Sequence, residues 1–149
     1  MSSIRRRFRY LDHMTDAVIE AYGCTLDEAF ENSACGLVNT MFDLKRVSPT
    51  QEINIQANGQ DLKSLLYDWL EKVLLTLLVE NILISVFKVK IYKNNNNNNN
   101  SYFLSGIAKG EYLNLKKHHY KLEVKAVTYH EMEIIQEKNK VITRFLLDL

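Results

Sequence analysis

Residues 61–78, DLKSLLYDWLEKVLLTLL, decide the fold that this chain can adopt. Their leucines, Trp69 and Val73 recur at helical spacing and form a broad apolar stripe, which predicts a heavily buried helix. Asp61 stands where such a helix needs an N-cap. We interpret the stripe as core, and a groove for a partner helix is the alternative. The β-branched run at 82–92 follows at once and predicts a strand.

Upstream of this helix, the sequence predicts three strands and a second helix. Residues 8–11 and 17–22 have strand-like patterns, and residues 53–57 alternate between apolar and polar side chains. Thr25-Leu26-Asp27-Glu28 has the form of a capping box, in which Thr25 caps the helix and Glu28 reaches back. The apolar spacing behind it predicts a helix through about Asp43.

Downstream, strands dominate, and the predicted fold is a single α+β domain over residues 1–149. The seven asparagines at about 94–100 have no packing face, and we expect a disordered loop between strands at 82–92 and 102–108. Further strands are predicted from residue 121 to 133 or beyond, and at 141–149. We expect two long helices packed on one face of a mixed, largely antiparallel sheet.

Composition limits the classes of function. The net charge is +1, so overall charge indicates neither a nucleic-acid partner nor a membrane. Four arginines near the start form a local exception, interpreted as a solubilising edge, with a weak RNA-backbone contact as the alternative. Cys24 and Cys35 have no zinc spacing, and no apolar signal segment follows the arginines. We therefore expect an intracellular protein, cytoplasmic or nuclear or both.

Acidic residues suggest a metal site. Asp148 lies one residue before the final carboxylate, at the end of a predicted strand, and two such charges repel unless a cation lies near them. Ca²⁺ is suited to carboxylate and carbonyl oxygens. Asp12, His13 and Asp16 lie between two predicted strands and could supply a further carboxylate. The alternatives are a solvated strand end at Asp148, and Asx-turns with a half-buried histidine at residues 12–16.

Motifs for stand-alone catalysis are missing from the sequence. There is no nucleophile elbow, Walker loop or dinucleotide-binding glycine pattern. A Cys–His nucleophile pair is an alternative, but Cys35 lies within a helical pattern and is expected to be packed. His118 and His119 are adjacent, so on a strand they could not readily share one metal. Lys125 falls on the same strand face as Glu123, either as a surface ion pair or as a lysine near the acidic cluster.

Several segments in register resemble the archease family. They are residues 10–16 (YLDHMTD), 19–23 (IEAYG), 25–32 (TLDEAFEN), 65–70 (LLYDWL), 123–132 (EVKAVTYHEM) and 146–149 (LLDL). Two features depart from the family pattern. Met14 and Thr15 stand where the family usually has Thr and Ala, and the change at Met14 removes a hydroxyl that could orient a neighbouring carboxylate. The asparagine run is foreign to the family core.

The resemblance implies an accessory protein that activates the RNA-splicing ligase of tRNA splicing, with RNA as an indirect partner. It implies that the protein promotes formation of the ligase–guanylate intermediate over multiple turnovers, without being an enzyme itself. It implies a divalent cation, Ca²⁺ above all, held by Asp16, Asp148 and Leu149. Lys125 matches a lysine near that site, and Asp12, His13 and His118 match supporting positions. A chaperone-like module with a structural metal, and a metal-dependent hydrolase, are the alternatives.

Overall fold

The computed structural model describes residues 7–11, 16–96 and 99–149. Within these residues the chain forms two α-helices, a short 3-10 helix and seven strands. In chain order they are β1 (Phe8–Leu11), β2 (Asp16–Gly23), α1 (Leu26–Met41), η1 (Leu44–Arg46), β3 (Gln51–Gly59), α2 (Leu62–Glu80), β4 (Ile82–Asn96), β5 (Asn99–Tyr112), β6 (Ala126–Glu137) and β7 (Lys140–Asp148).

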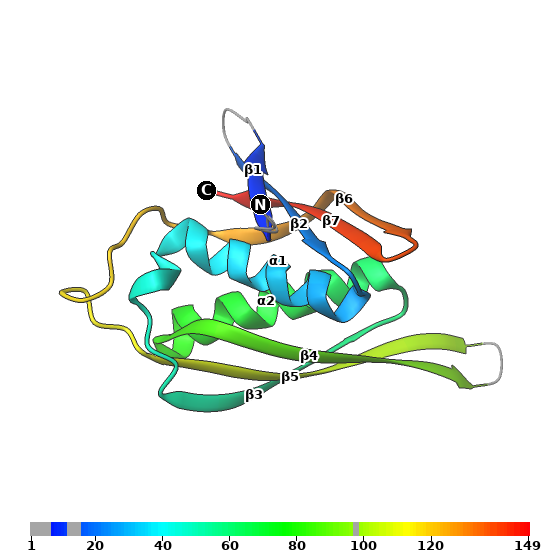
Figure 1. Cartoon of the computed structure of the whole chain (residues 1–149), viewed down its shortest axis with the longest axis horizontal. Helices are drawn as coiled ribbons and strands as arrows, with labels where there is room; N and C mark the ends of the chain where they lie inside the picture. The colour runs from blue at the N-terminus through cyan, green and yellow to red at the C-terminus, as the bar shows by residue number, and fades with distance from the viewer. Residues whose placement is uncertain (1–6, 12–15, 97–98) are drawn as a thin grey trace.

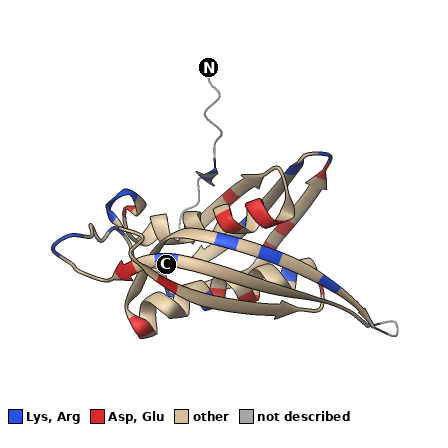
Figure 2. Ribbon diagram, turned by 60° about the horizontal axis from the view of Figure 1, so that its bottom comes forward, with Lys and Arg blue, Asp and Glu red and all other residues tan. Residues whose placement is uncertain are grey.

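The strands of the described residues form two sheets, and the helices lie between them (Figure 1). One sheet has the order β1-β2-β7-β6 and the other β3-β5-β4, and the strand pairs in both are antiparallel. Each helix contacts both sheets. The three-stranded sheet faces the viewer in Figure 2.

The predicted α+β class, with two long helices and largely antiparallel strands, is confirmed. The layering differs from the expectation of helices on one face of a single sheet. The reason lies in the width of the apolar surface of the helices. Residues of α2 that are spread widely around its axis, Leu65, Leu66, Trp69 and Leu70 among them, are all fully buried. A helix with so wide an apolar surface is covered only when layers pack on both sides.

Both helices begin at the predicted caps. The Thr25 hydroxyl accepts a hydrogen bond from the Glu28 N–H at 3.1 Å, and the Glu28 carboxylate accepts from the Cys24 N–H at 2.7 Å, one residue before the cap. Asp61 and Ser64 form a complete capping box at the start of α2. Helix α1 ends at Met41, two residues before the predicted end.

Trp69 joins the layers. Its side chain is fully buried, its Nε1 donates to the Phe30 carbonyl of α1 at 3.0 Å, and its ring meets Phe87 of β4 edge-on at a centroid distance of 5.8 Å. The indole therefore contacts both the other helix and the three-stranded sheet, with its one polar atom satisfied.

Two predicted boundaries need correction. The β4–β5 ladder continues into the asparagine run, with Asn94 opposite Ser101, Asn95 opposite Asn100 and Asn96 opposite Asn99, and residues 97–98 lie outside the described residues. Backbone pairing needs no packing face, so the paired strands extend past the predicted strand ends at residues 92 and 102. Strand β6 begins at Ala126 instead of residue 121, so Lys125 precedes the strand.

Candidate functional site

The start of β2 meets the end of β7. The two strands are antiparallel neighbours (Figure 1). Their register sets Asp16 directly opposite Asp148. Side chains directly opposite across two strands share a face, with Cβ atoms about 5 Å apart. Asp16 is half-buried and Asp148 is exposed. Two carboxylates in this position repel each other, and the repulsion falls when a cation lies between them.

Lys125 and Leu149 lie at the same end of this sheet. The Lys125 N–H donates to the Asp148 carbonyl at 2.8 Å, and Ala126 is the residue opposite Asp148 in the β6–β7 ladder. The register thus places Ala126, and not Lys125, on the face that carries the two aspartates. Lys125 is exposed just before the strand, while Leu149 is half-buried against the core.

A buried hydroxyl lies in the next row of the same face. Thr128 is opposite Leu146, which is two residues from Asp148 and therefore on the same side of the sheet. Among the described residues, the Thr128 Oγ1 has no hydrogen-bond partner although it is buried. A buried polar atom of this kind usually has a partner, and an ordered water or a hydrated ion can supply it.

The structure places His118 with the other sheet. Its ring is buried, its Nδ1 accepts from the Asn114 N–H at 2.9 Å, and its Nε2 lies 2.8 Å from a carboxylate oxygen of Glu111 on β5. Because Nδ1 is an acceptor, the proton resides on Nε2 and is donated to Glu111. His118 thereby anchors the segment 113–125 that leads to Lys125.

Two predicted residues cannot be placed. Asp12 and His13 lie outside the described residues, as do Met14 and Thr15. Within the described ranges, no three His, Cys, Asp or Glu side chains are grouped as metal ligands. The described donors at the sheet end are therefore two carboxylates and main-chain oxygens, which are the hard oxygen ligands that Ca²⁺ accepts together with water.

A charged row crosses the same face two rows further on, and sequence reasoning missed it. Arg9, Glu20, Arg144 and Glu133 are opposite one another on the four successive strands, with alternating charge. Glu20 is only 4% exposed and accepts from Arg144 at 2.8 Å and from the Tyr22 hydroxyl at 2.5 Å. The signal for it is a glutamate in the middle of the apolar run of residues 17–22.

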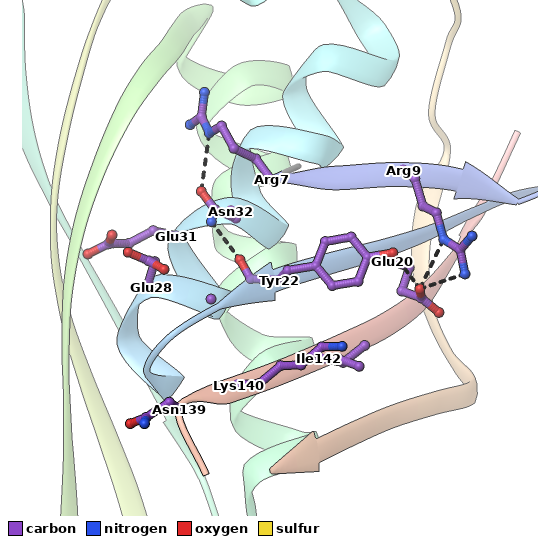
Figure 3. Close-up of a pocket in the computed structure, with 11 residues that line it drawn as sticks. Arg7, Arg9, Glu20, Tyr22, Glu28, Glu31, Asn32, Asn139, Lys140 and Ile142 are labelled. Carbon is purple, nitrogen blue, oxygen red and sulfur yellow. Dashed lines mark hydrogen bonds and ion pairs between the residues drawn. The ribbon is translucent and has the colours of Figure 1, made fainter. Parts of the chain in front are cut away.

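The surroundings of Glu20 change its pKa. Burial alone would raise the pKa, but the hydrogen bonds from Tyr22, Arg144 and Arg9 outweigh burial and lower it to about 2. Glu20, Arg9 and Tyr22 also line a cavity of about 860 Å³ between β1, β2 and the start of α1 (Figure 3). The two described arginines of the N-terminal cluster are thus engaged within the molecule: Arg9 with Glu20, and Arg7 with Asn32 at 3.3 Å.

Cys35 does not have the environment of a nucleophile. Cys35 is buried in α1 as predicted, and burial raises the pKa of its thiol to about 11. A nucleophilic cysteine needs the opposite shift, because the thiolate is the reactive form. Neither Cys24 nor Cys35 forms a disulfide. No helix among the described residues has the length and apolar character required to span a bilayer.

The fold defines a class of small α+β proteins in which a helical layer separates two antiparallel sheets. In this chain, two aspartates lie opposite each other at one sheet end. This chain belongs to the Archease protein family (MTH1598/TM1083), whose model matches residues 8–149. That result confirms the family identified from the sequence motifs.

Individual relatives agree. The chain is 40% identical over 143 residues to protein archease of Sulfolobus acidocaldarius, covering 96% of this chain and 99% of the relative. It is 40% identical over 129 residues to protein archease of Pyrococcus furiosus, covering 87% and 88%.

Solved structures agree as well. The solution structure of Methanobacterium thermoautotrophicum protein 1598 matches with a TM-score of 0.78 and 35% identity, over 96% of this chain and 99% of that one. An archease of Thermotoga maritima, described as a possible chaperone, shares the fold with a TM-score of 0.58 over the full length of both chains. Its 15% identity to this chain limits that comparison to the fold.

Proposed function

We propose that this protein is an accessory activator of the RNA-splicing ligase in tRNA splicing, and not an enzyme in its own right. It promotes guanylylation of the ligase and its multiple turnover through an acidic, metal-binding site. The observation that supports this proposal is the register of β2 and β7, which sets Asp16 opposite Asp148 with the Lys125 N–H bonded to the Asp148 carbonyl.

The proposed ligands are Asp16, Asp148 and an oxygen of Leu149, completed by water. Their all-oxygen chemistry suits a divalent cation such as Ca²⁺, which would neutralise the opposed carboxylates and offer positive charge to a partner's phosphate groups. Asp12 and His13 remain proposed supporting residues. The buried Thr128 hydroxyl can hydrogen-bond a water molecule in the row next to the aspartates.

Lys125 is the proposed contact to the ligase. It is exposed at the sheet end that carries the aspartates, so its ammonium can reach a bound partner. His118 has an indirect role in this proposal, because its bonds to Glu111 and Asn114 hold the segment that ends at Lys125.

The test measures ligase–guanylate formed by purified ligase over repeated turnovers, with and without this protein. The wild type is expected to raise adduct formation, and Asp16→Asn, Asp148→Asn and Lys125→Ala are expected to remove most of the effect. Glu52→Gln is the matched control, because Glu52 is an exposed carboxylate of the other sheet. Equal stimulation by the two aspartate variants would exclude the acidic site from the function.

Metal binding is tested separately by thermal unfolding with Ca²⁺ or with a chelator. Added Ca²⁺ is expected to raise the Tm of the wild type, since a ligand that binds only the folded state stabilises it. In chelator, Asp148→Asn is expected to be at least as stable as the wild type, because it removes the repulsion with Asp16. A Ca²⁺-dependent rise in Tm that persists in this variant would exclude Asp148 as a ligand.

A chaperone-like role is the second candidate, and one surface feature favours it. Leu75, Leu78 and Val79, near the end of α2, are 45%, 51% and 71% exposed. Exposed apolar side chains grouped in this way are typical of protein-binding surfaces. This role predicts that the protein suppresses aggregation of several RNA-processing proteins in light-scattering assays, with or without chelator, and that Leu78→Ser weakens the suppression.

A further inference from the structure

The outer face of the three-stranded sheet, on the side away from the helices, is not used by the proposed activator site. Strand alternation and register identify its residues. They are Glu52, Asn54, Gln56 and Asn58 on β3, Phe103, Ser105, Ile107 and Lys109 on β5, and Val86, Lys88, Lys90 and Tyr92 on β4. All twelve of these side chains are polar, charged or aromatic, or are exposed aliphatics, so this face does not resemble a second core.

Charge on this face has one dominant sign. Three lysines, Lys88, Lys90 and Lys109, stand against a single carboxylate, Glu52. The Lys109–Glu52 pair is loose, at 4.0 Å with both side chains about half exposed. Lys88 and Lys90 are exposed and project from one edge strand on the same side. In Figure 2, blue bands follow one strand of this sheet toward the tip of the β4–β5 hairpin.

An aromatic pair, with one ring exposed and the other half-buried, lies beside the lysines. Tyr92 and Phe103 are directly opposite each other, and their rings stack at a centroid distance of 6.2 Å with an interplanar angle of 27°. Tyr92 is 52% exposed. An open aromatic ring on a sheet, next to positive charge, is the arrangement on which unpaired bases stack, with Lys side chains contacting the phosphates.

Amide side chains complete the face. Asn54, Gln56 and Asn58 are all exposed on β3, the opposite edge strand from β4. Each amide can both donate and accept a hydrogen bond, as base edges and the ribose 2′-hydroxyl also do. From Val86 to Tyr92 the face extends about 20 Å along the strand, a length comparable to sheets that hold two or three nucleotides.

We propose that this outer sheet face binds single-stranded RNA, with Lys88 and Lys90 on the phosphates and the Tyr92–Phe103 pair stacking on bases. An acidic protein segment would satisfy the lysines but would leave the aromatic pair and the amide row without a matching partner. The proposed RNA surface lies on a different sheet from Asp16 and Asp148. A negative result for RNA binding would therefore leave the proposed ligase activation untouched, and the reverse also holds.

The test is fluorescence anisotropy of a labelled 12-nucleotide RNA without self-complementarity, titrated with the full chain at several salt concentrations. Tyr92→Ala is expected to weaken binding roughly tenfold, whereas Tyr92→Phe, which keeps the ring, retains it. Lys88→Gln with Lys90→Gln is expected to lower the slope of log affinity against log salt by about 1.4, or about 0.7 for each lost phosphate contact.

Matched controls lie outside the proposed face. Lys138→Gln with Lys140→Gln removes two exposed lysines of the β6–β7 hairpin, and Tyr112→Ala removes an exposed ring outside the proposed face. Both controls are expected to bind RNA as the wild type does. A duplex RNA, a single-stranded DNA and a polyglutamate peptide serve as competitors, and the labelled RNA is expected to be displaced least by polyglutamate and by duplex.

Three results would overturn the proposal. One is an absence of RNA binding at low salt. Another is unchanged binding by the Tyr92→Ala variant while circular dichroism shows that it is folded. The third is displacement of the RNA by polyglutamate at the same charge concentration as by unlabelled RNA, which would assign the face to an acidic protein.

Discussion

At the scale of single residues, Glu20 links the protein's stability to pH. Its folded-state pKa of about 2 lies below the usual 4.5, so its ionised form is favoured by folding. The stability that it contributes is therefore fully present above about pH 4.5, and it is lost as the pH falls toward 2. Glu111 contributes stability that is lost over the same pH range, because hydrogen bonds from Lys117, Ser48 and His118 lower its pKa to about 2.

Glu20→Gln is expected to lower the free energy of unfolding at pH 7 by roughly 2 kcal/mol, since it breaks an almost buried pair with Arg144 and Arg9. Urea denaturation at pH 7 and at pH 3 measures the effect. The difference between variant and wild type should shrink at pH 3. An equal loss at both pH values would contradict the linkage, and Glu52→Gln, whose carboxylate is exposed, is the control.

At the scale of elements, α1 covers the free edge of β4. Asp27 and Glu31 accept hydrogen bonds from the Ile91 and Val89 N–H groups, at 3.2 Å and 2.8 Å. These two donors have no neighbouring strand, because β4 is an edge strand of its sheet. The two carboxylates of α1 thus satisfy backbone donors at the edge of β4, where a strand from another molecule would otherwise pair.

At Glu31, two substitutions can separate the effect of the hydrogen-bond acceptor from the effect of the negative charge. Burial raises the pKa of Glu31, so its charge opposes folding while its oxygen satisfies Val89. Glu31→Ala is expected to cost about 1 to 2 kcal/mol by leaving that N–H unpaired, while Glu31→Gln keeps an acceptor and is expected to be neutral or slightly stabilising. Thermal unfolding at pH 7 compares the two, and equal losses would contradict the edge-capping role.

The asparagine-rich end of the hairpin is expected to contribute little to stability. Beyond the Asn94–Ser101 pair the ribbon has only two strands, since β3 ends opposite Tyr102. Replacing residues 95–100 with Asn-Gly would join the strands by a favoured two-residue turn. The free energy of unfolding should change by less than about 0.5 kcal/mol in urea titrations. A loss above about 2 kcal/mol would show that the run packs against the domain.

Sequence patterns that involve only neighbouring residues predicted the helices and strands well. They could not predict which distant strands pair with each other. Caps at Thr25 and Asp61, the apolar spacing of both helices and the strand alternation all depend on neighbours within a few residues. The opposition of Asp16 and Asp148 depends on register between strands more than 100 residues apart, and the family resemblance, not the spacing, brought these two residues together. Glu20 was missed because its partners Arg9 and Arg144 come from other strands.

At the scale of the whole molecule, the three layers are expected to unfold together. Trp69 connects α2 to α1 through the Phe30 carbonyl and to the three-stranded sheet through Phe87. It is also the only tryptophan, so its fluorescence reports on this junction. Urea transitions followed by tryptophan fluorescence and by far-ultraviolet circular dichroism should coincide. Separate midpoints would show that the four-stranded sheet unfolds independently of the helices.

The position of β7 also constrains synthesis of the protein. This strand is the last in the sequence, yet it lies between β2 and β6 in the interior of its sheet. During translation, the β1–β2 pair and β6 have no strand to join them until residues 140–148 leave the ribosome. The nascent chain can assemble the three-stranded sheet and both helices first, but the aspartate pair comes into being only when the final strand inserts. The activity proposed for that pair is therefore absent from any nascent chain that still lacks residues 140–148.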